Sequence, residues 1–571
     1  MRHLQARRPR TGVLAAQEGS LVTLSPDSHY LVAPQPLPAL QLRAYAGEAS
    51  ILKLSELCPA TVLHRDAPAN LQSKITSFRH DTEFEPCFLE IAIIACSEKV
   101  LSGLDDAVKG LFDCGCRSVF VVHGLVPEGP YFVRGQSIYR TWRLFPDVYE
   151  AFQLPTLQDD NSESFTGVSI MREGKLMVPV PSRLHYPRTA QKPLNGVRVT
   201  VKDIIDLKGV KTTGQSRSYE KLYGSRDETA AIIARLTELG AIVIGKTKCT
   251  QFASSDQPTA DWVDYHCPWN PRGDGYLSPR GSSTGTCVAL AGYDWCDVGI
   301  GIRGPAAVMG LFALRPTHTP EHLPGILPVA DDYWDQWPQN AARTVMEGAV
   351  ERLEAYLGVK RMVVSLAKKW LEVDPSRSGL PLDQFLQNTF MTLLWRGYYA
   401  NYLPFRKEYE ARFGNPPYVH PVIQSCWRHG KELSAEDVAR AHERKRIYAK
   451  WLRESVFGGD DEFNTIMVYP VGDINPFYRD VYRKDPLDVK PSYSWNERED
   501  HQASLAGIPS MVIPVGQVSH PSKVTGGEQD LPVAISLMSG AGTDSQLTGL
   551  LYAMTRNDFF RGEVRVGTHA F

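Results

Sequence analysis

The chain has 571 residues, of which 43% are hydrophobic, and a formal net charge of −2 at pH 7. A chain of this length and composition is globular and has room for roughly two to four domains. The balanced charge, with no long basic block, argues against nucleic acid as a partner, and no apolar run approaches the ~18 residues of a membrane-spanning helix.

The first sixteen residues carry four arginines before a short apolar piece, Val13 to Ala16. This piece is too short for the apolar part of a secretory signal, so we expect a disordered basic start, with the arginines leaving a mitochondrial location open. Ten cysteines show no paired C-x-x-C spacing, and Cys114 and Cys116 have no second pair to complete a metal site. We therefore expect free thiols, no metal and a reduced, cytoplasmic location.

A first structural unit is expected before about residue 165. Leu89–Ala95 and Ser118–Val122 read as strands, and Leu101–Phe112 has helical spacing, which indicates a small α/β or α+β unit. No residue there points to a chemistry of its own. The chain becomes polar between residues 158 and 175, and Asp159–Ser164 predicts a linker there. We therefore divide the chain into an N-terminal extension of unknown role, residues 1–165, and a main domain, residues 166–571.

The main domain opens with a strand pattern. Residues 197–201 read VRVTV, in which valine alternates with Arg198 and Thr200. This period of two predicts a strand that delivers Lys202 at its end. A lysine buried beside a pocket can lose its proton, and the neutral amine can act as a base toward a serine hydroxyl. The alternative for a single lysine is an ordinary surface residue before a turn.

A loop of small residues follows later, Gly281-Ser282-Ser283-Thr284-Gly285, and residues 286–290 fit a first helical turn. Small residues let the backbone approach a ligand closely, and the N–H groups at a helix start can face an anion or a developing oxyanion. A solvated turn is the alternative, because Gly/Ser loops before helices are common.

Together these two stretches resemble the amidase signature family, the Ser-Ser-Lys amide hydrolases. Lys202 stands in V-K-D, and Ser282 is the first serine of G-S-S-T-G, similar to the family's V-K-D and G-G-S-S-G-G segments. Further similar text lies around Glu228–Thr247 and Gly507–Gly516. The resemblance implies an α/β fold in which helices cover a mixed central β-sheet, and fungal-type members of the family carry N-terminal extensions of this sort.

The resemblance also implies a mechanism. Neutral Lys202 takes a proton through Ser282, which in the family lies on a cis peptide, from a nucleophilic serine that attacks an amide carbonyl. The acyl-enzyme is then hydrolysed, and no metal or organic cofactor is needed. The expected ligand is a small amide or acyl molecule, and a homodimer is left open.

The segment that should carry the nucleophile departs from the family pattern. The family reads G-T-D-T-G-G-S-I-R-x-P, whereas residues 298–305 read VGIGIRGP. Either the missing residues fall after Gly301 or, in an alignment without a gap, Gly301 itself stands at the serine position. Losing the nucleophile commonly costs on the order of 10⁶ in rate, and losing one oxyanion donor about 10²–10³. Ser283 is the nearest spare hydroxyl and the candidate substitute nucleophile.

A second block of family sequence is also missing. Gly325–Ala330 begins the family's next segment, but Asp331–Gln336 replaces the rest. A charged helical insert follows at about residues 347–457. Its aromatic residues between Trp395 and Tyr409 either line an acyl or aryl pocket or form part of the core.

Three hypotheses follow. The chain represents an amide hydrolase whose working form contains the missing segments, trimmed here by a faulty gene model; or it is a pseudoenzyme that binds amide or acyl ligands; or the amidase body is a scaffold for the N-terminal unit. We favour the first. Because the nucleophile is not found, we leave open whether this chain is an enzyme and expect it to be catalytically weak or dead.

Overall fold

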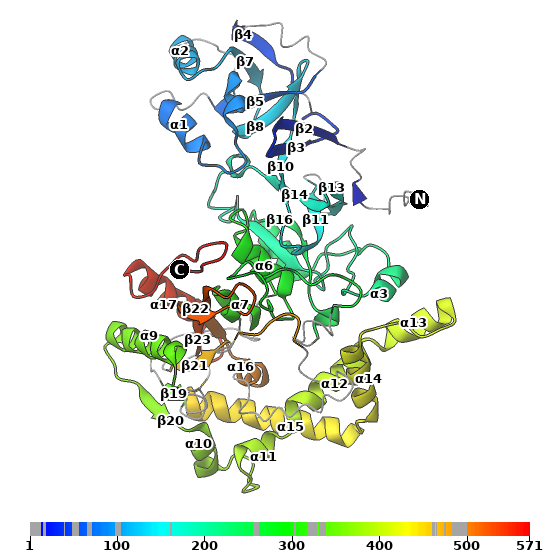
Figure 1. The fold of residues 1–571 in the computed structure, drawn as a ribbon, viewed down its shortest axis with the longest axis vertical. Coiled ribbons are helices and arrows are strands. Elements are labelled where there is room, and N and C mark those ends of the chain that lie inside the picture. Colours follow the sequence, from blue (N-terminus) through cyan, green and yellow to red (C-terminus); the bar gives the residue numbers. More distant parts are fainter. Residues whose placement is uncertain are drawn as a thin grey trace.

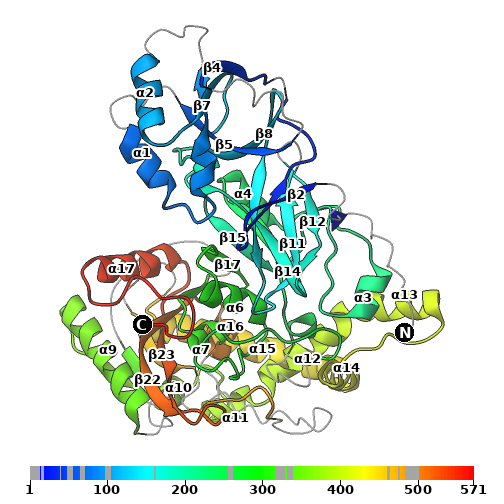
Figure 2. The same cartoon turned by 45° about the horizontal axis from the view of Figure 1, so that its top comes forward.

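The described residues of the computed structural model form four β-sheets flanked by helices (Figure 1). The N-terminal strands lie at one end of the molecule, most of the long helices lie at the other, and the sheet that carries Lys202 lies between them (Figures 1 and 2). This confirms the expected α/β class. The structure describes residues 13–14, 19–38, 40–47, 56–64, 71–96, 104–159, 163–254, 262–301, 304–316, 328–330, 339–459, 463, 465–472, 476–481 and 500–571.

The N-terminal sheet has six strands in the order β4-β7-β6-β5-β8-β9. Its three central strands pair in parallel, and both of their faces are buried, which explains the continuous apolar runs in their sequences. Helices α1 and α2 pack on one of these faces. The bounds are β4 (Arg43–Gly47), β5 (Cys58–His64), α1 (Leu71–Phe78), η3 (Pro86–Glu90), β6 (Ile91–Cys96), α2 (Asp105–Asp113), β7 (Ser118–His123), β8 (Gly129–Arg134) and β9 (Ser137–Tyr139).

A five-stranded antiparallel sheet, β13-β14-β10-β3-β2, joins the N-terminal sheet to the rest. The bounds are β2 (Ser20–Ser25), β3 (Ser28–Val32), β10 (Thr141–Pro146), β13 (Ile170–Arg172) and β14 (Lys175–Pro181). Strands from both sides of residue 165 therefore share this sheet, and the division into independent domains at that residue stays a prediction.

The linker expected at Asp159–Ser164 falls between β11, which ends at Gln158, and β12 (Phe165–Val168); residues 160–162 of it lie outside the described residues. The rest of the polar stretch up to Lys175 forms strands, in which Phe165, Val168 and Ile170 are buried. At the chain start, β1 (Val13–Leu14) pairs with β12, so these two residues are not disordered. The other residues before Gly19, the four arginines among them, lie outside the described residues.

The central sheet has the order β1-β12-β11-β16-β15-β17. The remaining bounds are β11 (Phe152–Gln158), β15 (Arg198–Lys202), β16 (Ile242–Thr247) and β17 (Val298–Ile300). β16, β15 and β17 are parallel, and β11 is antiparallel to β16. The sheet is therefore mixed, as expected. Helices α3 (Arg217–Leu222), α4 (Ala231–Glu238), α6 (Thr284–Gly292) and α7 (Gly304–Met309), with the short turns η4 (Arg183–His185) and η5 (Gln251–Ala253), belong to the same part of the chain.

A last six-stranded sheet, β18-β22-β23-β21-β19-β20, packs against α9 and α17. The bounds are β18 (Ala313–Arg315), β19 (Pro328–Ala330), α9 (Ala341–Leu357), β20 (Met362–Val364), β21 (Met467–Val471), α16 (Asp500–Ala506), β22 (Ser510–Pro521), β23 (Glu528–Met538) and α17 (Asp544–Arg556). Of the second shortened family segment, only β19 is described, and Asp331–Gln336 lies outside the described residues.

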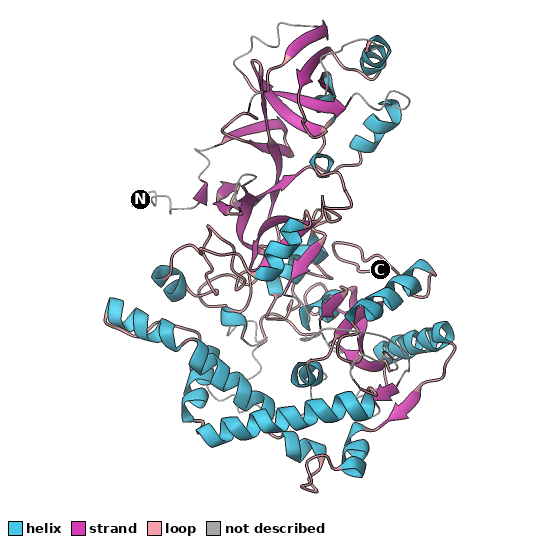
Figure 3. Ribbon diagram, turned by 180° about the vertical axis from the view of Figure 1, so that it is seen from behind, coloured by secondary structure: helices cyan, strands magenta, loops and turns pink. Residues whose placement is uncertain are grey.

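The helical insert gathers at one end of the molecule (Figure 3). Its bounds are α10 (Leu366–Val373), α11 (Leu382–Leu386), α12 (Thr389–Asn401), α13 (Leu403–Phe413), α14 (Pro421–Glu432), α15 (Ala435–Trp451) and the π-helical η6 (Leu452–Val456). Its aromatic stripe packs on Phe252 and Tyr219 of the main domain, with the rings of Phe252 and Tyr402 4.2 Å apart, which fits the core alternative. No helix in the described part of the chain is long and apolar enough to cross a membrane.

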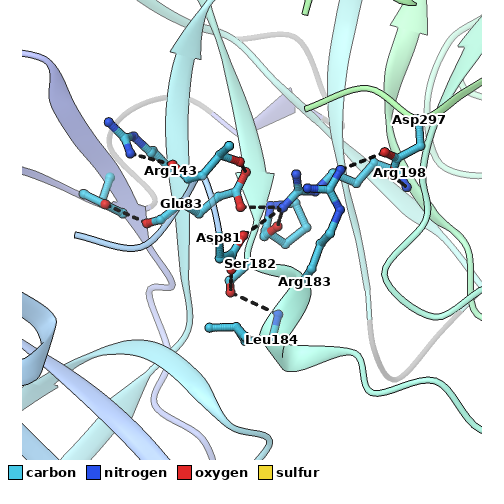
Figure 4. Close-up of polar contacts among 11 residues, drawn as sticks. Asp81, Glu83, Arg143, Ser182, Arg183, Leu184, Arg198 and Asp297 are labelled. Carbon is cyan, nitrogen blue, oxygen red and sulfur yellow. Dashed lines mark hydrogen bonds and ion pairs between the residues drawn. The ribbon is translucent and has the colours of Figure 1, made fainter. Parts of the chain in front are cut away.

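A buried ion cluster fastens the N-terminal unit to the central sheet (Figure 4). Arg198, at the start of β15, is fully buried and lies 2.6 Å from Glu83 and 3.8 Å from Asp81. Burial raises the pKa of Glu83 to about 8. Burial acts to raise the pKa of Asp81 too, but hydrogen bonds with Glu83 and Ser182 lower it. Glu83 therefore holds the proton of this carboxyl pair, and Arg198 balances the remaining negative charge.

The same cluster reaches the next strand of the central sheet. The carboxylate of Asp297, directly before β17, accepts the backbone N–H of Arg198 at 2.8 Å and a hydrogen bond from Arg183, also at 2.8 Å. Asp297 thus joins the starts of β15 and β17 to η4, the short turn that follows β14 and contains Arg183.

Candidate active site

The candidate site lies where three parallel strands end together. Lys202 ends β15 and is in register with Thr247 at the end of β16, while Val201 pairs with Ile300 at the end of β17. Ligand sites in open α/β sheets form at this carboxyl edge, outside the strand ends. All five residues of β15 are buried, so Lys202 is not the surface lysine of the alternative interpretation.

The loop before α6 is held over this edge by backbone contacts. The carbonyl of Ser282 accepts the N–H of Thr250 at 3.0 Å, and Thr284 donates its hydroxyl to the carbonyl of Arg280 at 2.6 Å. The Gly281–Ser282 peptide is cis. Gly285 has to be glycine, because a Cβ there would lie 2.2 Å from the carbonyl oxygen of Ala151. The helix expected after this loop is α6.

Lys202 and Ser282, predicted as separate site residues, are brought together by this arrangement. The Nζ atom of Lys202 donates to the Oγ atom of Ser282 at 2.7 Å, and Lys202 is only 6% exposed. Burial lowers the pKa of the Lys202 amine, while the nearby thiols of Cys249 and Cys287 act in the opposite direction. Lys202 has no ion pair among the described residues that would offset this shift toward the neutral amine, the form that can accept a proton.

A second buried lysine supports the site and was missed in the sequence. Lys246, from the G-K-T segment, lies 3.6 Å from the carboxylate of Asp203 and donates to Thr212 at 2.7 Å. Asp203 also accepts the hydroxyl of Thr213 at 2.8 Å. This network ties the turn after Lys202 to β16. The sequence held a signal for this contact, because Asp203 lies in the V-K-D motif and Lys246 in the G-K-T motif. Considered together, the two motifs could have predicted the pair.

Ser283 and Gly301, the two other predicted site residues, contact each other. The hydroxyl of Ser283 donates to the carbonyl of Gly301. Gly301 has a φ of +100°, and a Cβ on it would lie 3.0 Å from the Cβ of Lys202. Gly301 therefore lies directly against the lysine side chain. Residues 302 and 303 lie outside the described residues, and α7 begins at Gly304.

The role of Ser283 as substitute nucleophile stays a prediction. The described contacts give the Lys202 amine one hydroxyl partner, Ser282, while the Ser283 hydroxyl points to a backbone carbonyl. A nucleophile needs a base within hydrogen-bond reach. In this arrangement Ser283 would first have to exchange its partner.

The ten cysteines are all free thiols. In the described part of the chain, no group of three or more histidine, cysteine or carboxylate side chains is placed to hold a metal ion. The site itself holds an amine and a hydroxyl together in a buried position.

The fold and this pair define an α/β protein with a buried, hydrogen-bonded lysine–serine pair at the carboxyl edge of a mixed sheet. Residues 182–324 match the family model described as Amidase. These residues include Lys202, Ser282, Ser283 and Gly301. This part of the chain is therefore similar to the amidase family, as its motifs predict.

The similar curated proteins cover part of the chain. A glutamyl-tRNA(Gln) amidotransferase subunit of Roseiflexus sp. (strain RS-1) is 34% identical over 164 residues, which are 28% of this chain and 32% of that protein. The corresponding amidotransferase subunit of Lawsonia intracellularis (strain PHE/MN1-00) is 28% identical over 254 residues, 43% of this chain and 47% of that protein. The chain thus spans about a third of the length of the first relative and about half of the length of the second. Among solved structures, 6-aminohexanoate cyclic dimer hydrolase with its substrate gives a TM-score of 0.48 at 15% identity, covering 64% of this chain and 85% of that one.

Proposed function

We propose that this chain carries the site of a hydrolase that acts on carbon–nitrogen bonds of small amides, in which Lys202 is the base and Ser282 the hydroxyl that relays the proton. The observation that carries the proposal is the 2.7 Å hydrogen bond between the Lys202 amine and the Ser282 hydroxyl. The lowered pKa of the buried amine supports the base role, and the family match of residues 182–324 supports the reaction class.

The proposed reaction is acyl transfer to a serine. The attacking hydroxyl would give its proton to Ser282, whose own proton passes to Lys202, and the leaving amine would take that proton back as the C–N bond breaks. Water would then release the acyl group by the same path in reverse. Residues 298–305 contain no hydroxyl that could attack, so we propose that the chain as given has weak or no turnover.

The second candidate is a pseudoenzyme that binds amide or acyl ligands without turnover. It is favoured by Gly301, which packs against Lys202 where the family's nucleophile segment would pass. The free thiols of all ten cysteines support a reducing, cytoplasmic location for either candidate.

The test replaces Gly301 by the family segment G-T-D-T-G-G-S in the full chain. We expect this variant to react with a fluorophosphonate probe and to hydrolyse small amides, with both activities lost when Lys202→Ala is added. The matched control is the same insertion ending in alanine. A folded insertion variant that neither reacts nor turns over would contradict the assignment of Lys202 and Ser282 and leave the pseudoenzyme as the better account.

The unaltered chain is measured beside it. We expect little or no labelling by the probe. Strong labelling that disappears in Ser283→Ala would show instead that Ser283 is a working substitute nucleophile, and the chain would be an enzyme as it stands.

A further inference from the structure

A turn outside the family match supports the candidate site. Residues 147–151 lead from β10 of the joining sheet to β11 of the central sheet. They precede residues 182–324, the part of the chain that matches the family model. The turn begins with a buried carboxylate, Asp147, which is 2% exposed and lies outside the proposed proton path.

The Asp147 carboxylate holds this turn from the inside. It accepts the backbone N–H groups of Ala151 and Phe152, both at 2.8 Å. Its third donor is the hydroxyl of Tyr293, at 2.6 Å, and that hydroxyl accepts the backbone N–H of Tyr149 at 2.9 Å. A buried polar network whose groups are satisfied keeps a single arrangement.

The end of helix α6 rests on this network. Tyr293 directly follows the helix and is 5% exposed, so its bond to Asp147 ties the carboxyl end of α6 to the turn. Gly292, the last residue of the helix, lies against the Tyr149 ring, because a Cβ on Gly292 would be 2.6 Å from a ring carbon. The turn therefore fixes where α6 ends.

The start of α6 rests on the same turn. A Cβ on Gly285, the second residue of the helix, would lie 2.2 Å from the carbonyl oxygen of Ala151. That carbonyl accepts the N–H of Lys248 at 2.9 Å, and the Lys248 carbonyl accepts the N–H of Gly285 at 2.8 Å. Lys248 directly follows β16, whose last residue, Thr247, is in register with Lys202. The turn thus contacts the start of α6 and the strand end beside the candidate base.

The position of α6 sets the position of Ser282. The helix begins at Thr284, two residues after Ser282, and the Ser282 hydroxyl lies 2.7 Å from the Lys202 amine. A displacement of about 1 Å in a catalytic group can cost about a hundredfold in rate. A reactive pair therefore needs supports that are themselves locked by packing and hydrogen bonds.

We propose that Asp147 is a positioning residue for the Lys202–Ser282 pair. Asp147 holds the 147–151 turn, the turn holds both ends of α6, and α6 holds the Ser282 loop against Lys202. The predicted N-terminal extension, residues 1–165, then supplies part of the support of the site. The inference rests on the proposed function, because this placement matters to the reaction only if the pair transfers a proton.

The test uses Tyr293→Phe in the full chain. Phenylalanine keeps the ring and removes the hydroxyl that joins α6 to Asp147. The matched control is Tyr448→Phe, because Tyr448 is also buried and donates its hydroxyl to a side-chain oxygen, that of Gln502, at 2.9 Å in the helical insert. Both variants lose a buried hydrogen bond and should have a lower melting temperature, but only Tyr293→Phe should alter the site.

The first readout is an NMR titration of the lysine side chains, with the Lys202 signal identified by its absence in Lys202→Met. We expect Tyr293→Phe to raise the pKa of the Lys202 amine toward that of the exposed lysines, because a loosened loop lets water reach the amine. Tyr448→Phe should leave it unchanged. If Lys202 titrates with the exposed lysines already in the unaltered chain, the proposed function fails. If it titrates lower there and equally low in Tyr293→Phe, the proposed function stands and the positioning role is overturned.

The second readout is kinetic. In the variant that carries the family segment in place of Gly301, Tyr293→Phe should lower kcat about tenfold to a hundredfold with KM nearly unchanged. Tyr448→Phe should alter neither constant. Equal losses of kcat in the two variants would show a general effect of destabilisation and overturn the positioning role.

A further variant decides the question if Tyr293→Phe does not fold. Gly292→Ala keeps every hydrogen bond of the network, but its Cβ displaces the Tyr149 ring from the end of α6. We expect the pKa of Lys202 to rise in this variant as well, by less than in Tyr293→Phe. An unchanged Lys202 titration in folded Gly292→Ala would contradict the proposal.

Discussion

The two ends of strand β15 each bury a cation, and the two cations behave differently. At the start, Arg198 is fully buried beside the Asp81–Glu83 carboxyl pair and lies 3.8 Å from the Asp81 carboxylate. At the end, Lys202 is almost as deeply buried but has a hydroxyl, Ser282, as its polar partner. A buried cation beside a carboxylate keeps its charge and joins two parts of the chain, whereas a buried amine without one tends to lose its proton.

The difference teaches how one strand can serve both stability and chemistry. The side chain of Arg198 is a guanidinium, which stays charged under all ordinary conditions, while a lysine amine changes its pKa readily when buried. The choice of residue type at each end matches the choice of partner. The predictions below test this contrast, from the largest expected effect to the smallest.

The largest effect is expected for Arg198→Met. Removing one member of a buried ion cluster leaves the others without a counter-charge, and we expect a loss of about 3–5 kcal/mol in the free energy of unfolding. Urea denaturation measures it. The control is Arg235→Met, because Arg235 forms an exposed pair with Glu238 and should cost less than about 1 kcal/mol. Equal losses in the two variants would contradict the role given to Arg198.

A smaller loss, about 1–3 kcal/mol, is expected for Gly301→Ser. Gly301 has a φ of +100°, and the added Cβ would lie 3.0 Å from the Cβ of Lys202. Thermal denaturation and probe labelling are measured together, and labelling should not increase. Gly358→Ser is the control, since Gly358 also has a positive φ but has no atom near its Cβ position. A stable, labelled Gly301→Ser enzyme would show that one hydroxyl at this position suffices.

The pH dependence of stability should carry the signature of Glu83. Its pKa rises from an ordinary value of 4.5 to about 8 in the folded chain, so between these values the folded state holds a proton that the unfolded state has released. The contribution of Glu83 to the stability of the fold is therefore greatest below about pH 4.5 and falls as the pH rises to about 8.

We expect the loss from Glu83 over this window to be at least about 1 kcal/mol. Melting temperatures across the window measure it, and Glu83→Gln should flatten the slope, since glutamine keeps the hydrogen bonds and does not titrate. Asp81, whose pKa is lowered, changes the stability of the fold only below its ordinary pKa of 3.8, which is outside the window. An identical slope in Glu83→Gln would assign the dependence to other groups.

The smallest effect on stability is expected for Lys202→Met, about 1 kcal/mol or less. It removes one net hydrogen bond, and methionine no longer has an amine to desolvate. Lys246→Met is the matched comparison, because it leaves the fully buried Asp203 without its cation and should cost several times more. If Lys202→Met proves the more damaging of the two, Lys202 is charged in the folded chain.

The sequence predicted the Lys202 site at the end of β15 but not the Arg198 ion cluster at its start. The alternation over Val197–Val201 and the G-S-S-T-G loop were local patterns, so Lys202, Ser282 and α6 could be expected from them. The Arg198 cluster depends on Asp81 and Glu83, which lie far away in the sequence and carry no motif. Likewise, the strands between Phe165 and Lys175 could not be expected from a polar stretch, because a few buried apolar residues, such as Phe165, decided the strand pairing.

The central claim is that burial lowers the pKa of the Lys202 amine in the folded chain. The most direct measurement is an NMR titration of side-chain ¹⁵Nζ or ¹³Cε lysine signals, with the Lys202 signal identified by its absence in Lys202→Met. We predict that Lys202 titrates below the range of the exposed lysines in the same sample. Titration together with those exposed lysines would contradict the claim, because a lysine charged at neutral pH could not act as the base of this site.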